Sequence, residues 1–288
     1  MPELPEVETI VRDLRNKLKG QKINDFSCDR PKLLNLPLAT FKKKIVGRLF
    51  INARRRAKMI ILDLDNDLSI LIHLKMTGQL ILRGKSGKYS GGGHPIDHYL
   101  QELPNNFTHA IFTLTSGQQL FFNDIRMFGY LKLIESIELP DLFKNKLGPE
   151  PLNQSFTLPV FKELINKRKI GKIKPLLMDQ SFIAGIGNIY ADEVCHYAKI
   201  QPTRIAGLLK DDEVKRLYQG IRKILPQAIA LRGTSADTYV DSDGKKGSYE
   251  EKLKVYGRKS KKCLTCQTPL KSMKLNGRTT VYCPSCQK

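Results

Sequence analysis

The N-terminal residues Pro2 and Glu3 could carry out amine chemistry on an aldehyde carbon. Pro2 is small enough for Met1 to be removed, which would leave a proline with a free secondary amine. An α-amino group titrates near pH ~7.7–8.0, so part of it is neutral and nucleophilic at physiological pH. Beside a carboxylate, such an amine can attack a sugar carbon and form a Schiff base. The same residues could instead simply start a helix, since proline and acidic residues both suit the first turn.

The cysteines near the C-terminal end have the spacing of a closed metal site. Two Cys-x2-Cys pairs are separated by sixteen residues: Cys263, Cys266, Cys283 and Cys286. Asn276-Gly277 lies between the pairs and is a typical hairpin turn. Four thiolates complete a tetrahedron with no open position, so the pattern predicts one structural zinc ion and not a catalytic one. The isolated Cys28 and Cys195 are predicted to fill core positions.

The charge of the chain indicates a polyanionic partner. Lys and Arg number 49 against 28 Asp and Glu, a net charge of +21. The basic residues are spread along the whole chain, whereas a membrane reader would more often carry one basic amphipathic helix, so nucleic acid is favoured. No apolar run approaches the ~20 residues of a membrane span, and the acidic N-terminus is unlike a signal peptide. We therefore expect a soluble, intracellular protein without membrane contact.

The elements that must position these residues change along the chain. Residues 5–19 have the periodicity of an amphipathic helix. Strand-like runs separated by turn formers follow and predict an all-β sandwich or barrel, with a long loop or insertion at 84–106. Beyond Pro140 we expect a linker at 147–152, a loop at 233–247 that is ordered but mobile, and helices at 157–167, 172–179, 188–197 and 211–231.

Several motifs, taken together in chain order, resemble the bacterial formamidopyrimidine-DNA glycosylase family of DNA-repair enzymes. They cover nearly the whole chain: residues 2–9, 54–58, 73–78, 126–129, 147–152, 185–191, 255–258 and 277–283. The resemblance implies an α+β fold in which an N-terminal helix and a β-sandwich precede a helix-two-turn-helix domain and a zinc-finger β-hairpin. The implied boundaries are 1–138 for the catalytic domain, 139–152 for a linker, 153–260 for the helical domain with a lesion-recognition loop, and 261–288 for the zinc finger.

The resemblance also implies an activity, that of a bifunctional DNA glycosylase and AP lyase. Such an enzyme removes oxidised purines (8-oxoguanine and formamidopyrimidines) in base excision repair. Pro2 would attack the sugar C1′ and form an imine, the electron sink for β- and δ-elimination. Glu3 would act as general acid near the sugar ring oxygen, and Glu6 would orient the site. Lys58 and Arg278 would serve the two eliminations or hold phosphates.

A base inside a duplex must be everted before such chemistry, and the gap must be filled. The family's gap-filling residues are matched by an apolar wedge, a donor to the orphaned cytosine and an aromatic wedge: Met76, Arg126 and Phe128. Its phosphate contacts on the helical domain are matched by Lys169, Lys174 and Asn188. Damaged double-stranded DNA is thus the implied partner of a monomeric, cytoplasmic and nucleoid-associated protein.

Two positions depart from the family pattern, and three other functions stay open. Phe107 stands where the family often has a histidine, and Arg232 stands where a glycine is common.

The alternatives are an endonuclease VIII-like glycosylase for oxidised pyrimidines, a non-catalytic lesion-binding protein and an RNA-binding zinc protein. Leu4, Lys58 and the Arg126-x-Phe128 pattern favour the purine branch, whereas the N-terminal proline and glutamate argue against a protein without catalysis.

Overall fold

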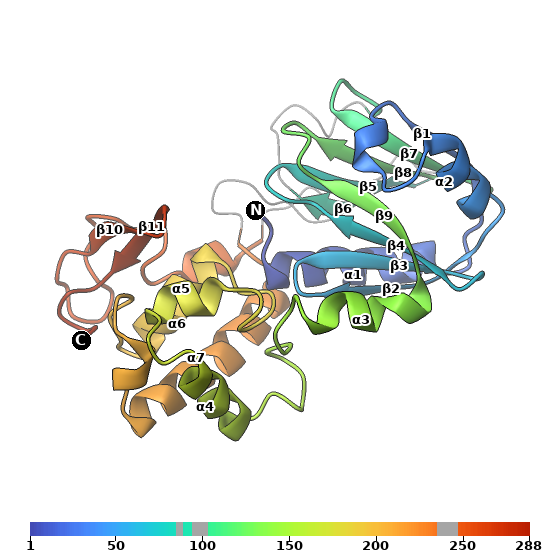
Figure 1. Cartoon of the computed structure of the whole chain (residues 1–288). Helices are drawn as coiled ribbons and strands as arrows, with labels where there is room; N and C mark the ends of the chain where they lie inside the picture. The colour runs from blue at the N-terminus through green and yellow to red at the C-terminus, as the bar shows by residue number, and fades with distance from the viewer. Residues whose placement is uncertain (85–88, 94–102, 235–246) are drawn as a thin grey trace. The chain divides into compact units, whose positions relative to one another are not determined.

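The computed structural model describes residues 1–84, 89–93, 103–234 and 247–288 (Figure 1). The chain forms two compact units. The first comprises Met1–Phe143 together with Leu231–Ser248, and the second comprises Lys144–Ala230 together with Tyr249–Lys288. Among the described residues, no helix is long and apolar enough to cross a bilayer.

The first unit is a β-sandwich, as predicted. One sheet has the strand order β1-β7-β8-β5-β6 and the other the order β2-β3-β4-β9, and neighbouring strands are antiparallel. The strands are β1 (Ile23–Cys28), β2 (Phe50–Arg56), β3 (Met59–Leu64), β4 (Leu68–His73), β5 (Gly78–Arg83), β6 (Tyr89–Gly93), β7 (Thr108–Leu114), β8 (Gln119–Asp124) and β9 (Tyr130–Glu135).

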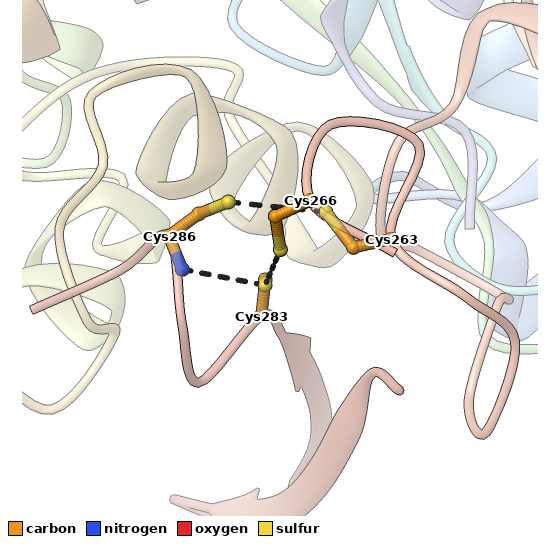
Figure 2. A group of neighbouring side chains, drawn as sticks. All are labelled: Cys263, Cys266, Cys283 and Cys286. Carbon is orange, nitrogen blue, oxygen red and sulfur yellow. Dashed lines mark hydrogen bonds between the residues drawn. The ribbon is translucent and has the colours of Figure 1, made fainter. Parts of the chain in front are cut away.

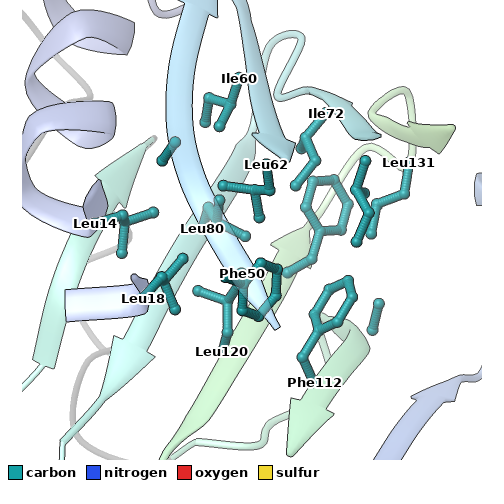
Figure 3. Packing of buried hydrophobic residues seen from close by; sticks show 14 of the residues in the cluster. Leu14, Leu18, Phe50, Ile60, Leu62, Ile72, Leu80, Phe112, Leu120 and Leu131 are labelled. Atoms are coloured by element: carbon teal, nitrogen blue, oxygen red, sulfur yellow. The ribbon is translucent and has the colours of Figure 1, made fainter. Parts of the chain in front are cut away.

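Helix α1 (Leu4–Leu18) covers an edge of each sheet. It contacts β2 and β6, which are the edge strands of the two sheets, and thereby blocks both edges from pairing with another chain. Its apolar face joins the core between the sheets, where Leu14 and Leu18 lie near Phe50 (Figure 3). Helix α2 (Leu38–Ile45) packs on β1. The fold therefore holds the N-terminal residues at the start of a buried helix.

The second unit is helical and ends in a β-hairpin. Its helices are α4 (Leu158–Lys167), α5 (Ile173–Met178), α6 (Asn188–Tyr197) and α7 (Asp211–Ala230), and its hairpin pairs β10 (Lys271–Leu275) with β11 (Arg278–Tyr282). Asn276 and Gly277 have φ angles of 47° and 73°, as a two-residue turn of type I′ requires. The four helices begin and end within a few residues of their predicted bounds.

Three stretches differ from the sequence prediction. Helix α3 (Leu139–Lys144) occupies part of the predicted linker at 139–152, because Leu139 and Phe143 are buried. Strand β6 lies within the predicted loop at 84–106. The residues from 231 to 248 group with the first unit and not with the helical domain. Most of the predicted mobile loop, 235–246, lies outside the described residues, as do 85–88 and 94–102.

Candidate active site and nucleic-acid interface

Pro2 and Glu3 are both buried immediately before α1. Glu3 is the N-cap: its backbone N–H donates to Glu6 Oε2 over 2.9 Å, and its carboxylate accepts the Glu6 N–H. This reciprocal capping box fixes the first turn. The Pro2 nitrogen lies at the positive end of the helix dipole, which disfavours a protonated amine once Met1 has been removed. The N-terminus therefore combines the predicted nucleophile and acid in one rigid turn.

Glu6 joins the start of α1 to the segment that follows α7. Its Oε1 accepts hydrogen bonds from the Thr234 backbone N–H over 2.9 Å and from the Thr234 hydroxyl over 3.3 Å. A Cβ at Gly233 would lie 2.7 Å from the same oxygen, and the φ of +81° at this glycine disfavours any other residue. The predicted orienting residue is thus a buried anchor for a second segment.

Arg232 shows how the chain accommodates its departure from glycine. It has a φ of 63°, which is costly for a residue with a Cβ. Its guanidinium lies 2.6 Å from Asp13 Oδ2 on α1. This ion pair provides a second connection between the segment and the helix. Together with the Glu6 contacts, it explains why residues 231–248 belong to the first unit.

Lys58 lies in the turn between β2 and β3 and is only 5% exposed. The pairing of Ile60 with Ile72 places this turn beside the end of β4. At that end, burial lowers the pKa of His73 to about 3, helped by the positive charges of Lys75 and Lys58. His73 is therefore neutral, and its Nδ1 accepts the Lys75 backbone N–H over 3.0 Å.

The three predicted gap-filling residues lie on two neighbouring loops of the first unit. Met76 is on the loop from β4 to β5, and Arg126 and Phe128 are on the loop from β8 to β9. These loops lie at one end of the sandwich, because β5 pairs with β8 and β4 pairs with β9. Phe128 is 56% exposed, and the Arg126 guanidinium lies 4.8 Å from its ring centroid. An exposed aromatic beside a cation suits insertion into a base stack.

Asp124, which none of the sequence predictions named, connects the two loops. The Asp124 carboxylate is 1% exposed. It accepts the Thr77 hydroxyl at Oδ1 and the Gly129 backbone N–H at Oδ2, the latter over 2.7 Å. The Thr77 hydroxyl in turn accepts the Arg126 backbone N–H over 3.0 Å. Their positions in the sequence could have indicated this role, because Thr77 lies inside the 73–78 motif and Asp124 lies two residues before Arg126.

Lys174 is fully buried, so it does not have the accessible ammonium that the predicted phosphate contact requires. Its Nζ lies 2.7 Å from Asp192 Oδ1 and donates to the Thr280 hydroxyl over 2.7 Å and to the Thr279 carbonyl over 3.3 Å. Asp192 Oδ2 accepts the Val281 N–H over 3.0 Å. Burial raises the pKa of Asp192 to about 7. The pair thus fastens β11 to α5 and α6 and leaves no ammonium for a phosphate.

The other predicted contacts of the second unit are accessible. Asn188 is the first residue of α6, and its Nδ2 donates to the Thr279 carbonyl over 3.2 Å. Arg278 is exposed at the start of β11, and Lys169 is exposed after α4. A helix N-terminus with an amide side chain beside an exposed guanidinium is suited to phosphate.

The four C-terminal cysteines converge as predicted (Figure 2). Their sulfur atoms all lie within 4.8 Å of one another, and the Cys263–Cys286 and Cys266–Cys283 distances are 4.0 and 3.4 Å. A tetrahedral site with Zn–S bonds of ~2.3 Å separates sulfurs by about 3.8 Å, so the cluster fits one structural zinc ion. The Thr265 N–H donates to the Cys263 sulfur over 3.4 Å, which favours the thiolate.

Family models cover most of this architecture. A formamidopyrimidine-DNA glycosylase N-terminal domain matches residues 1–131, a formamidopyrimidine-DNA glycosylase H2TH domain matches 147–240, and a zinc finger found in FPG and IleRS matches 260–288. The β-sandwich, the helical unit and the four-cysteine hairpin define a DNA-repair glycosylase of the helix-two-turn-helix class. The chain belongs to the formamidopyrimidine-DNA glycosylase family, whose members have glycosylase and AP lyase activity.

Relatives are similar over their full length. Formamidopyrimidine-DNA glycosylase of Pelotomaculum thermopropionicum is 41% identical, with 100% of this chain and 99% of the relative covered. That of Listeria monocytogenes is 40% identical, with both chains fully covered. Two Lactococcus lactis structures are similar: a variant bound to DNA containing Fapy-dG (TM-score 0.88, 34% identity, both chains fully covered) and a complex with abasic-site DNA (TM-score 0.86, 33% identity, 99% of each chain covered).

Proposed function

We propose that this chain is a bifunctional glycosylase and AP lyase that excises oxidised purines, 8-oxoguanine and formamidopyrimidines, from double-stranded DNA in base excision repair. The observation that carries the proposal is the buried Pro2-Glu3 turn at the start of α1, fixed by the Glu3–Glu6 capping box. A lesion-binding protein without catalysis would have no use for an N-terminal amine at this place. Full-length similarity to enzymes of this name supports the same conclusion.

In the proposed reaction Pro2 is the nucleophile. After removal of Met1, the lone pair of its nitrogen attacks the sugar C1′, and the bond from C1′ to the damaged base breaks with its electron pair on the base. The proton of the amine is transferred to the departing base, which leaves a neutral nitrogen. The C1′–O4′ bond then opens to an iminium, and Glu3 gives a proton to the ring oxygen. Loss of a C2′ proton expels the 3′ phosphate, and a second elimination expels the 5′ phosphate. Hydrolysis of the iminium returns the amine.

The remaining residues hold the DNA. Met76, Arg126 and Phe128 occupy the gap left by the everted nucleotide, and Arg126 donates to the orphaned cytosine. Lys169 and Asn188 contact phosphates, and Lys58 and Arg278 serve the two eliminations or hold phosphates. Lys174 acts indirectly, by fastening the hairpin that carries Arg278.

We place this activity in a monomer that works in the bacterial cytoplasm on nucleoid DNA. Support comes from the net charge of +21, which suits a polyanion. In the first unit, α1 covers an edge of each sheet, which removes two surfaces on which a second copy could add a strand.

The test is an excision assay on duplexes that each contain one lesion opposite its normal partner. The proposal predicts release of 8-oxoguanine opposite cytosine and strand cleavage that leaves phosphates at both ends. Excision of oxidised pyrimidines alone would identify an endonuclease VIII-like enzyme. Tight binding of the lesion duplex without base release, by protein lacking Met1, would identify a non-catalytic binder.

A further inference from the structure

One hydroxyl group connects the two loops that carry the gap-filling residues. Thr77 Oγ1 donates to the Asp124 carboxylate and accepts the Arg126 backbone N–H over 3.0 Å. Thr77 directly follows Met76, so the hydroxyl joins the backbone beside the apolar wedge to the backbone that carries Arg126. A hydroxyl can donate and accept at once, and a methyl group at this position could do neither.

Asp124 is held rigidly enough to serve as the fixed point of this connection. His109 Nε2 donates to its carbonyl over 3.0 Å, and its Oδ2 accepts the Gly129 N–H over 2.7 Å. A Cβ at Gly129 would lie 2.6 Å from Phe122 Cζ and 3.0 Å from Asp124 Oδ2, so only glycine allows this approach. The carboxylate thus fixes the far end of the β8–β9 loop as well as the β4–β5 loop.

Two loop residues show that this arrangement has a conformational cost. Lys75 and Met127 have φ angles of 51° and 55°, and each directly precedes a gap-filling residue, Met76 or Phe128. Left-handed backbone at residues with a Cβ persists where surrounding contacts over-determine it, and it clusters at functional sites. At Lys75 one such contact is the backbone N–H, which donates to His73 Nδ1 over 3.0 Å, and the Thr77–Asp124 connection follows two residues later.

We propose that Thr77 and Asp124 are positioning residues that couple the two loops, so that the wedge and the cytosine donor occupy the gap in the duplex as one pre-organised unit. Ordering two loops separately would cost conformational entropy at each insertion, and their coupling removes that cost. The inference rests on the proposed function, because it assigns the coupling to the base-eversion step.

The test compares Thr77→Val with Thr77→Ser and measures two substrates. Excision of 8-oxoguanine from a duplex requires gap filling, whereas cleavage of a preformed abasic site in single-stranded DNA does not. For T77V we expect a loss of about ten-fold or more on the duplex, the size of effect that a lost buried hydrogen bond produces. Cleavage of the single strand should stay within about two-fold, since the chemistry is unchanged, and T77S should retain both activities.

The matched control is Ser69→Ala. Ser69 is fully buried at the start of β4, and its hydroxyl donates to the Asp63 carboxylate over 2.7 Å, far from the two loops. Loss of this hydroxyl should lower the unfolding temperature without the substrate-specific defect. Asp124→Leu provides a second variant in case T77V fails to fold, because leucine has neither of the oxygens that accept the Thr77 hydroxyl and the Gly129 N–H. Like T77V, this variant should lose excision from the duplex while it retains cleavage of the abasic site in single-stranded DNA.

A second experiment tests the coupling independently of catalysis. It uses a duplex in which a fluorescent base stands beside a tetrahydrofuran analogue of an abasic site, and it measures the fluorescence change when that base unstacks. Its unstacking reports insertion without any chemistry, and the signal should develop at least about ten-fold more slowly with T77V. Equal unstacking by T77V and wild type, or equal losses on both DNA substrates, would overturn the coupling. Wild-type protein that unstacks the base but never excises a lesion would overturn the proposed function and leave the coupling standing.

Discussion

Glu3 has two tasks in this account, and they can be separated by substitution. Its carboxylate caps α1, and it is the proposed acid for the sugar ring oxygen. Glu3→Gln keeps an acceptor for the cap but has no acidic proton. We expect unchanged thermal stability and a fall in base excision of about 10²–10⁴-fold, the usual contribution of a general acid. Glu3→Ala should also lose about 1 kcal/mol of stability with the cap. Excision rates and unfolding curves test both.

His73 predicts a pH dependence of stability. Its folded pKa of about 3 lies below the unfolded value, because burial and two lysines oppose its charge. Between pH 6.5 and 3 the unfolded chain binds a proton that the folded chain does not, so stability falls as the pH falls. The slope from this one residue is at most about 1.4 kcal/mol per pH unit. Denaturant unfolding of wild type and His73→Asn measures the free energy of unfolding at each pH in this range. We expect it to depend less steeply on pH in the variant. Parallel pH dependences would contradict the assignment of this effect to His73.

At the scale of elements, Lys174 and Lys169 form a matched pair of predictions. Lys174→Met leaves Asp192 buried without its partner and should cost about 3–5 kcal/mol of stability. Lys169→Met removes an exposed ammonium and should leave the unfolding curve unchanged while weakening DNA binding. Calorimetry and binding titrations distinguish the two roles. A K174M protein as stable as wild type, with weaker DNA binding only, would instead support the phosphate contact that the family resemblance implies.

The sequence predicts elements well where periodicity or spacing carries the signal. Helix α1, the zinc cysteines and the Asn276-Gly277 turn were all predicted, because local patterns determine them. Strand β6 was not, since Gly91–Gly93 have no side chains to alternate, and the strand forms by pairing with β5. The burial of Lys174 could not be predicted for a related reason, because its partners lie on α6 and β11, which are distant in the sequence. Contacts between distant segments leave no local pattern.

At the scale of the whole molecule, the charge of +21 predicts a steep salt dependence of DNA binding. Each phosphate contact releases counterions, so the logarithm of affinity falls linearly with the logarithm of salt concentration. Lys169→Met and Arg278→Met should each reduce that slope by about 1. Titrations at several salt concentrations measure it, with Ser69→Ala as the control that keeps the wild-type slope. Unchanged slopes in both charge variants would remove these residues from the interface.

The zinc hairpin should fold only with its metal, because the segment is too short to hold itself together otherwise. Cys266→Ser should therefore lose bound zinc and weaken DNA binding, since Arg278 lies on this hairpin. Metal analysis and binding titrations test this, and zinc-free protein that binds DNA normally would contradict it.

The most direct measurement is borohydride trapping on a duplex with one 8-oxoguanine opposite cytosine, with removal of Met1 first verified by mass spectrometry. The proline mechanism predicts a covalent adduct that peptide mapping places on the nitrogen of Pro2, and its loss or relocation in Pro2→Gly. An adduct on a lysine in the wild-type protein, or none at all with Met1 removed, would contradict the proline mechanism.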